Sequence, residues 1–264
     1  MKTKLTKTEL TLIASMLFGL FFGAGNLIFP IYMGQLAGAN MWIAFLGLLI
    51  TGVGLPLLGV AAIGISRSDG LIELSGKVGR GYSVFFTCAL YLTIGPFFAI
   101  PRCGAVSFTI GMKSMLGEGA YTEGVLVVFS LLFFLAVLVL SLNSGEILTW
   151  VGKVLTPLFL VFLAALVAAA LFRPMGSISE MAATGKYAAS PFVAGFLEGY
   201  NTMDALASLA FGIVVITVIR DLGVKEPGAV AAYTVKAGVF SCLFMGLIYL
   251  AVAVVGAQTG TLYA

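Results

Sequence analysis

Histidine is absent from this chain of 264 residues, and charged side chains make up only 9% of it. The absence of histidine removes the commonest zinc ligand and the side chain that most readily exchanges protons near neutral pH. Soluble domains carry about 25% charged residues. A chain of this size with so few charges cannot cover a surface that faces water, so the composition excludes a soluble enzyme or binding domain.

Dense basic runs are also missing. The net charge is only +3, and the basic cluster of Lys2, Lys4 and Lys7 stands at the N-terminus, directly before an apolar stretch. Such a cluster is typical of a cytoplasmic anchor beside a membrane span. The charge pattern therefore predicts no nucleic-acid partner.

Cysteine occurs three times, at Cys88, Cys103 and Cys242, each within an apolar segment. This spacing fits neither a disulfide framework nor a metal site. It is typical of small apolar side chains buried between helices. Since the sequence also holds no recognisable nucleophile–base pair or metal motif, we expect no enzymatic activity.

Long apolar stretches are what the sequence does contain. Hydrophobic residues make up 61% of the chain, and the mean hydropathy is +1.13. The apolar runs are continuous rather than alternating, and each is long enough for the roughly 20 residues that a membrane helix needs. The sequence predicts an all-α integral membrane protein, in contact with lipid and forming one transmembrane domain over residues 1–264. About seven spans are expected, near residues 9–33, 42–65, 82–111, 124–142, 148–172, 191–218 and 229–256.

The distribution of Lys and Arg predicts the orientation of these spans, because cytoplasmic loops carry an excess of both. With the N-terminus in the cytoplasm, nine basic residues face inward and three face outward. We therefore expect a multi-pass protein of the inner (plasma) membrane with a cytoplasmic N-terminus. The inward set is Lys2, Lys4, Lys7, Arg67, Lys77, Arg80, Lys153, Arg220 and Lys225, and the outward set is Lys113, Arg173 and Lys186.

Two spans are interrupted. The first carries Gly-Ala-Gly-Asn at residues 23–26, and the sixth carries a polar cluster over residues 198–204. Glycine costs about 1 kcal/mol relative to alanine inside a helix. A five-helix unit repeated in inverted topology would place its first helix at spans one and six, in antiparallel orientation. Broken helices at such corresponding places indicate a transporter binding site. The alternative is a face of small residues for helix packing, with Asn26 forming an interhelical hydrogen bond.

Three stretches resemble bacterial branched-chain amino acid:cation symporters. They are "FGAGNLIFP" at 22–30, "LYLTIGPFFAIPR" at 90–102 and "GYNTMDALASLAFGIV" at 199–214. The resemblance implies the leucine-transporter fold, of which this chain would hold the first repeat and two helices of the second, with helices 1 and 6 discontinuous. It implies uptake of leucine, isoleucine and valine coupled to sodium ions, with the proton as the alternative coupling ion.

The chain departs from this family in three places. Ile31 stands where the family has a second proline, and Cys103 and Gly104 stand where it has threonine and alanine. The family has about twelve helices, so we expect the chain to be C-terminally incomplete. Two further functions therefore stay open, a non-transporting truncated remnant and a cation channel.

The resemblance also implies roles for single residues. Sodium would be bound by Gly23, Asn26 and Thr202. Glu198 and Asp204, which are ionisable groups at membrane depth, would have structural or coupling roles. The substrate would contact Phe22, Ala24, Gly25, Tyr91, Tyr200, Asn201 and Thr202.

Overall fold

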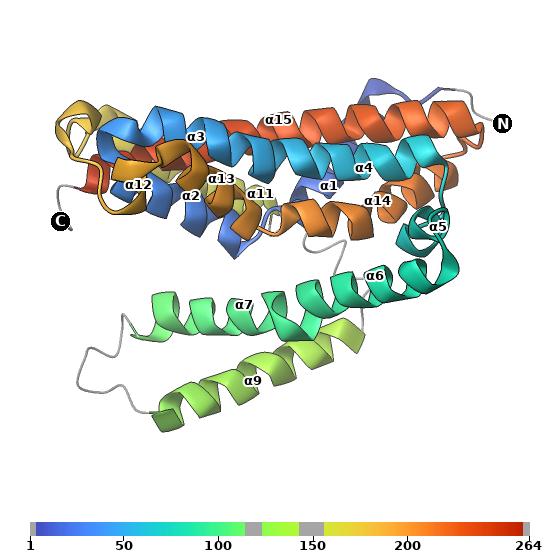
Figure 1. Ribbon diagram of the computed structural model, residues 1–264, viewed down its shortest axis with the longest axis horizontal. Helices are drawn as coiled ribbons and strands as arrows, with labels where there is room; N and C mark the ends of the chain where they lie inside the picture. The colour runs from blue at the N-terminus through green and yellow to red at the C-terminus, as the bar shows by residue number, and fades with distance from the viewer. Residues whose placement is uncertain (1–3, 114–122, 143–155, 261–264) are drawn as a thin grey trace. The chain divides into compact units, whose positions relative to one another are not determined.

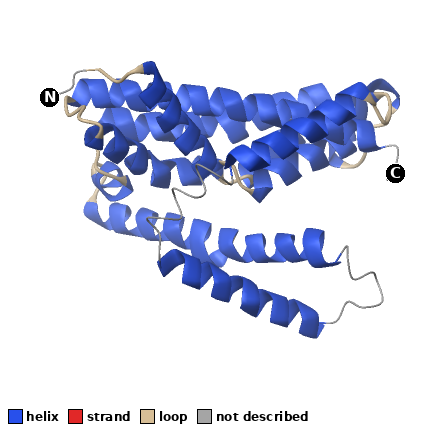
Figure 2. Cartoon of the chain, turned by 180° about the vertical axis from the view of Figure 1, so that it is seen from behind, coloured by secondary structure: helices blue, strands red, loops and turns tan. Residues whose placement is uncertain are grey.

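A computed structural model describes residues 4–113, 123–142 and 156–260. These residues form helices and contain no strand (Figure 2). The predicted fold class, an all-α integral membrane protein, is confirmed. Five helical segments are long and apolar enough to cross a membrane, and Pro157–Phe172 is a shorter apolar helix. The five segments are Gly25–Ser66, Arg80–Met112, Glu123–Leu142, Pro191–Asp221 and Pro227–Thr259.

The chain divides into two compact units, here called the larger unit (Met1–Cys88 and Phe159–Ala264) and the smaller unit (Ala89–Leu158). Two helices contribute to both, α6 (Arg80–Leu92) and α11 (Thr156–Phe172). The helices of the larger unit are α1 (Lys7–Phe21), α2 (Ala24–Ala37), η1 (Gly38–Asn40), α3 (Met41–Leu49), η2 (Ile50–Gly54), α4 (Leu55–Ser66), α5 (Leu71–Gly76), η6 (Ile178–Glu180), α12 (Lys186–Ala189), α13 (Pro191–Asn201), α14 (Asp204–Asp221) and α15 (Pro227–Thr259) (Figure 1).

The first expected span is divided between α1 and α2. A capping box starts α1: the backbone N–H of Glu9 donates to the Thr6 hydroxyl, and the Glu9 carboxylate accepts from the backbone N–H of Thr6. At the far end of α2, Gly38 has φ +46°, a conformation that favours glycine, and the chain turns there into α3. The 42-residue apolar segment that begins at Gly25 thus contains two helical passages.

The α3–η2–α4 stretch runs as one helical path with a π-helical turn at η2, and the sixth expected span packs along it. α13 packs against α3 and η2, whereas α14 packs against α4. Glycine makes this approach possible: a Cβ atom on Gly195 would lie 1.8 Å from the carbonyl oxygen of Ala44, and one on Gly47 would lie 2.2 Å from that of Phe192. The backbones of α3 and α13 are therefore in direct contact.

The 33-residue helix α15 packs against α1, α2 and α4 (Figure 1). Its contact with α2 again depends on glycine. A Cβ atom on Gly34 would lie 2.1 Å from the carbonyl oxygen of Ala253, and one on Gly256 would lie 2.2 Å from that of Ile31. α15 thus braces both halves of the first broken span.

The smaller unit contains the end of α6, the π-helical turn η3 (Thr93–Phe97), α7 (Ala99–Ser107), η4 (Phe108–Lys113) and α9 (Glu123–Leu142). Gly95 leaves helical geometry next to Pro96, so the path from α6 to α7 is kinked. Aromatic rings join α9 to η4, with the ring centroids of Phe108 and Phe129 5.3 Å apart.

The cysteine prediction is right for one residue and wrong for two. Cys242 is buried in α15, but Cys88 and Cys103 are exposed on α6 and α7. Exposed apolar side chains such as Phe85 and Phe97 cover the same stretch. A thiol behaves as a small apolar group, so a helix face directed at lipid accommodates it as readily as a packed interior.

Candidate functional site

Both interrupted spans are broken, as predicted, but each break is shorter than the sequence pattern suggested. The first consists of Phe22 and Gly23, whose backbones are extended, and the second of Thr202 and Met203. Met203 has φ +68°, a left-handed conformation that costs about 1–2 kcal/mol for a residue with a side chain. Met203 has this conformation at the point where α13 ends and α14 begins.

Residues expected to be unwound lie in helices on either side. Ala24, Gly25 and Asn26 form the first turn of α2, because the Asn26 side-chain oxygen accepts the backbone N–H of Gly23 at 2.9 Å and starts the helix there. Residues 198–201 of the polar cluster are likewise helical and form the end of α13.

Asn26 and Asp204 join the two breaks directly, although 178 positions separate them in the sequence. The Nδ2 atom of Asn26 donates to the Oδ2 atom of Asp204 at 2.5 Å. Both side chains are buried, with exposed fractions of 2% and 3%. A hydrogen bond to a buried carboxylate is worth about 1.5–3 kcal/mol, so this contact fixes the start of α2 against the start of α14.

Tyr249 of α15 completes the junction. Its hydroxyl donates to the Oδ2 atom of Asp204 at 2.8 Å and also accepts from the Nδ2 atom of Asn26. The ring is fully buried. Tyr249 is not among the predicted site residues. Its signal in the sequence is weak: a tyrosine in the middle of an apolar span needs a polar partner for its hydroxyl.

The backbone around the second break is held by hydroxyl groups. The Thr202 hydroxyl donates to the carbonyl oxygen of Gly199 at 2.8 Å and lies 3.5 Å from the backbone nitrogen of Asp204. On the neighbouring helix, the Thr51 hydroxyl donates to the carbonyl oxygen of Phe196 at 2.6 Å. Asp204 stands in the first turn of α14, where the helix dipole stabilises a negative charge.

Glu198 is the centre of a second buried cluster, one turn before the second break. Lys186 forms an ion pair with its Oε1 atom at 2.5 Å, and the Tyr187 hydroxyl donates to the same oxygen at 3.2 Å. The amide of Asn201 donates to Oε2 at 3.4 Å. Burial, followed by the charge of Glu198, raises the pKa of the Tyr187 phenol far above its ordinary value.

The segment that carries Lys186 is hydrogen-bonded to the turn between α2 and α3. The backbone N–H of Thr184 donates to the carbonyl oxygen of Leu36 at 2.9 Å, and the side-chain amide of Asn40 donates to that of Tyr187 at 3.1 Å. This segment therefore connects the far end of α2 with α13.

Of the remaining predicted site residues, Phe22 belongs to an aromatic cluster beside the first break. Its ring stacks on Phe18 with centroids 4.9 Å apart and lies 5.5 Å from Phe159 of α11. Tyr200 is 46% exposed on α13. Tyr91 belongs to the smaller unit, where it is 47% exposed on α6.

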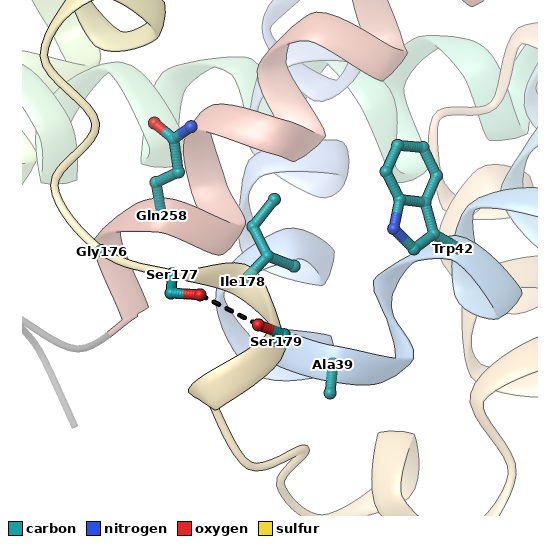
Figure 3. Close-up of a pocket in the computed structure, with 7 residues that line it drawn as sticks. All are labelled: Ala39, Trp42, Gly176, Ser177, Ile178, Ser179 and Gln258. Atoms are coloured by element: carbon teal, nitrogen blue, oxygen red, sulfur yellow. Dashed lines mark hydrogen bonds between the residues drawn. The ribbon is translucent and has the colours of Figure 1, made fainter.

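A separate hollow of about 520 Å³ lies at the end of the larger unit that carries η1 and the end of α15 (Figure 3). The hydroxyls of Ser177 and Ser179 are hydrogen-bonded at 2.9 Å on its wall. None of the predicted site residues lines this hollow, which is formed by Ala39, Trp42, Gly176, Ser177, Ile178, Ser179 and Gln258.

Comparison with known proteins places the chain in a family. Residues 6–264 match the family described as "Branched-chain amino acid transport protein". The chain is 55% identical over 261 residues to the branched-chain amino acid permease BrnQ of Lactobacillus delbrueckii subsp. lactis, covering 99% of this chain and 58% of that protein. It is 43% identical over 259 residues to BrnQ of Bacillus subtilis (strain 168), covering 98% of this chain and 58% of that protein.

The branched-chain amino acid transport system 2 carrier protein of Pseudomonas aeruginosa is 43% identical over 257 residues, with 97% of this chain and 57% of that protein covered. The chain thus spans less than two thirds of the length of these relatives. No solved structure matches it. The chain belongs to the family of branched-chain amino acid transport proteins.

Proposed function

We propose that this chain is the substrate-binding part of a secondary transporter that takes up leucine, isoleucine and valine together with sodium ions. One observation carries the proposal: in a chain of this family, the two broken helices meet through the buried hydrogen bond between Asn26 and Asp204. Broken helices that face one another at membrane depth are the usual construction of a transporter binding site.

The helix ends at the breaks supply groups for a zwitterionic substrate. The first turn of α2 carries the backbone N–H groups of Ala24 and Gly25 at the positive end of a helix dipole, which favours a carboxylate. The ring of Phe22 offers apolar surface for an aliphatic side chain. Tyr200, Asn201 and Thr202 would complete the pocket.

Sodium suits the donor set because small hard cations are bound by oxygen. The carbonyl of Gly23, the amide oxygen of Asn26 and the hydroxyl of Thr202 would provide neutral oxygens. Each already takes part in a hydrogen bond at the breaks. Each oxygen also has a second lone pair, so it could bind a cation without losing its present hydrogen bond. The proton is the alternative coupling ion.

The architecture of the whole transporter is part of the proposal. The pair α1–α2 would correspond to the pair α13–α14 in two inverted repeats, with the chain in the inner (plasma) membrane and its N-terminus in the cytoplasm. The interruption of both pairs near their middles supports this correspondence.

The proposal is tested by uptake of radiolabelled leucine, isoleucine and valine into cells that lack their own uptake systems and express the protein that carries this chain. We expect accumulation that requires an inward sodium gradient and stops when the gradient is collapsed. A sodium flux without amino acid would indicate a channel instead, and the absence of both would indicate a non-transporting remnant.

The sodium ligands are tested in the same assay with Asn26→Ala and Thr202→Ala. Loss of one neutral ligand is expected to cost about 1–3 kcal/mol and to raise the sodium concentration needed for half-maximal uptake. An unchanged sodium dependence in both variants would leave these two residues with a packing role only.

A further inference from the structure

The orientation of the Asn26 amide is determined by its neighbours. A carboxylate only accepts hydrogen bonds, so the NH₂ group of the amide must face Asp204. The backbone N–H of Gly23 only donates, so the amide oxygen must face the first break. Turning the amide over would oppose donor to donor at Gly23 and acceptor to acceptor at Asp204.

We propose that Asp204 and Tyr249 are positioning residues for the substrate and ion site. They hold the Asn26 amide with its oxygen directed at Gly23, and they tie both helix breaks to α15. This inference rests on the proposed function, because it assigns these residues to the same site. Its physical basis is burial: Asn26, Asp204 and Tyr249 are all at most 3% exposed, so water cannot replace a lost partner.

Tyr249 extends the site to a third helix. Its hydroxyl is hydrogen-bonded to both Asn26 and Asp204. The backbone of α15 also contacts that of α2 at Gly34 and Gly256. A displacement of α15 would therefore move the Asn26 amide. Substrate binding at the breaks and the position of α15 are coupled through this hydroxyl group and through the backbone contact between α15 and α2.

An exchange of side chains tests the assignment. Asn26→Asp alone places one carboxylate against another, so that acceptor faces acceptor. Asp204→Asn alone removes the charge, but its amide oxygen can still accept from Asn26 and Tyr249. The double variant Asn26→Asp/Asp204→Asn restores the set with donors and acceptors reversed. The carboxylate at position 26 accepts from Gly23, from the amide at position 204 and from the Tyr249 hydroxyl. That hydroxyl in turn accepts from the amide at position 204, which takes the place of the Oδ2 atom of Asp204.

The measurement is binding of leucine to the purified protein as a function of sodium concentration. We expect Asn26→Asp to weaken binding and its sodium dependence by about tenfold or more, the factor that corresponds to one hydrogen bond to a charged group, and Asp204→Asn to weaken them less. The double variant should return to within about threefold of the wild type, since the lost hydrogen bonds are restored. A double variant as weak as Asn26→Asp would overturn the assignment, because it would show that restoring the hydrogen bonds does not restore the site.

Tyr249→Phe has a matched control on the same helix. The Ser241 hydroxyl is buried in α15 and, within the described part of the chain, has no hydrogen-bond partner. Ser241→Ala should leave sodium-dependent leucine binding unchanged, whereas Tyr249→Phe should weaken it. Equal binding in both variants would exclude a positioning role for Tyr249.

Thermal unfolding of the same variants separates this inference from the proposed function. If the wild type binds no leucine, the proposed function fails, but the junction is still judged by stability. Non-additive unfolding temperatures in the Asn26/Asp204 cycle would support the junction. Strictly additive temperatures would overturn it.

Discussion

At the scale of single residues, the ion pair of Lys186 and Glu198 has an asymmetric environment. The Glu198 side chain is 4% exposed, whereas the Lys186 side chain is 50% exposed. Removing the lysine leaves a buried carboxylate whose charge is no longer neutralised, and this is more costly than losing an exposed ion pair.

Lys186→Met is therefore expected to lower the free energy of unfolding by about 1–3 kcal/mol. Lys186→Met/Glu198→Gln should recover most of this loss, because a neutral amide still accepts from Tyr187. Thermal unfolding in detergent measures both, with Lys225→Met on the exposed surface as control. A double variant as unstable as Lys186→Met would refute the role of the buried charge.

Glu226 caps α15, and its contribution depends on pH. Its carboxylate accepts the backbone N–H groups of Gly228 and Ala229, which lower its pKa below the ordinary value of 4.5. A group whose folded pKa is lowered stabilises the fold above its unfolded pKa and loses this effect as the pH falls through the folded pKa. The wild type should thus lose more stability on acidification than Glu226→Gln, as measured by unfolding temperature. Parallel losses would contradict the capping role.

At the scale of elements, the contact between α3 and α13 depends on glycine. A Cβ atom at position 195 would lie 1.8 Å from a backbone oxygen of α3, which no rotamer change relieves. Gly195→Ala should therefore force the helices apart and destabilise the fold by about 1–3 kcal/mol. Gly81→Ala in α6 is the matched control, because a Cβ atom there meets nothing within 4 Å. A smaller loss for Gly195→Ala than for the control would disprove the close approach.

The helices and the existence of both breaks could be predicted from the sequence, but the extent of the breaks could not. Apolar length and the glycines near Asn26 are local features, which a single sequence displays. The start of α2 at Ala24 depends on where the Asn26 side chain turns, and that is decided by Asp204 and Tyr249 in other helices. Pairings across so many residues leave no local pattern, so Tyr249 was not predicted at all.

Lys186 illustrates the same limit at the candidate site. Its position in a loop predicts only an outward-facing charge. Its partner Glu198 could be identified as an ionisable group at membrane depth, but not as the centre of an ion pair. An ion pair between residues of different elements can be identified only when the fold is known.

At the scale of the whole molecule, the distribution of basic residues predicts which loops face the cytoplasm. Single cysteines introduced at Ser177 and Gly223, in a chain without its own three cysteines, can be labelled in intact cells with a reagent that does not cross the membrane. We expect labelling at position 177 and protection at position 223. The opposite pattern would reverse the orientation.

We propose that a branched-chain amino acid binds at the helix breaks of the larger unit. The most direct measurement is protection of an introduced cysteine by substrate in the same cysteine-free protein. Tyr200 lies beside the second break and Trp42 lines the separate hollow, and the two are 46% and 55% exposed. Leucine with sodium should slow the alkylation of Tyr200→Cys and leave that of Trp42→Cys unchanged. Protection of Trp42→Cys without protection of Tyr200→Cys would place the substrate in the hollow and contradict the claim.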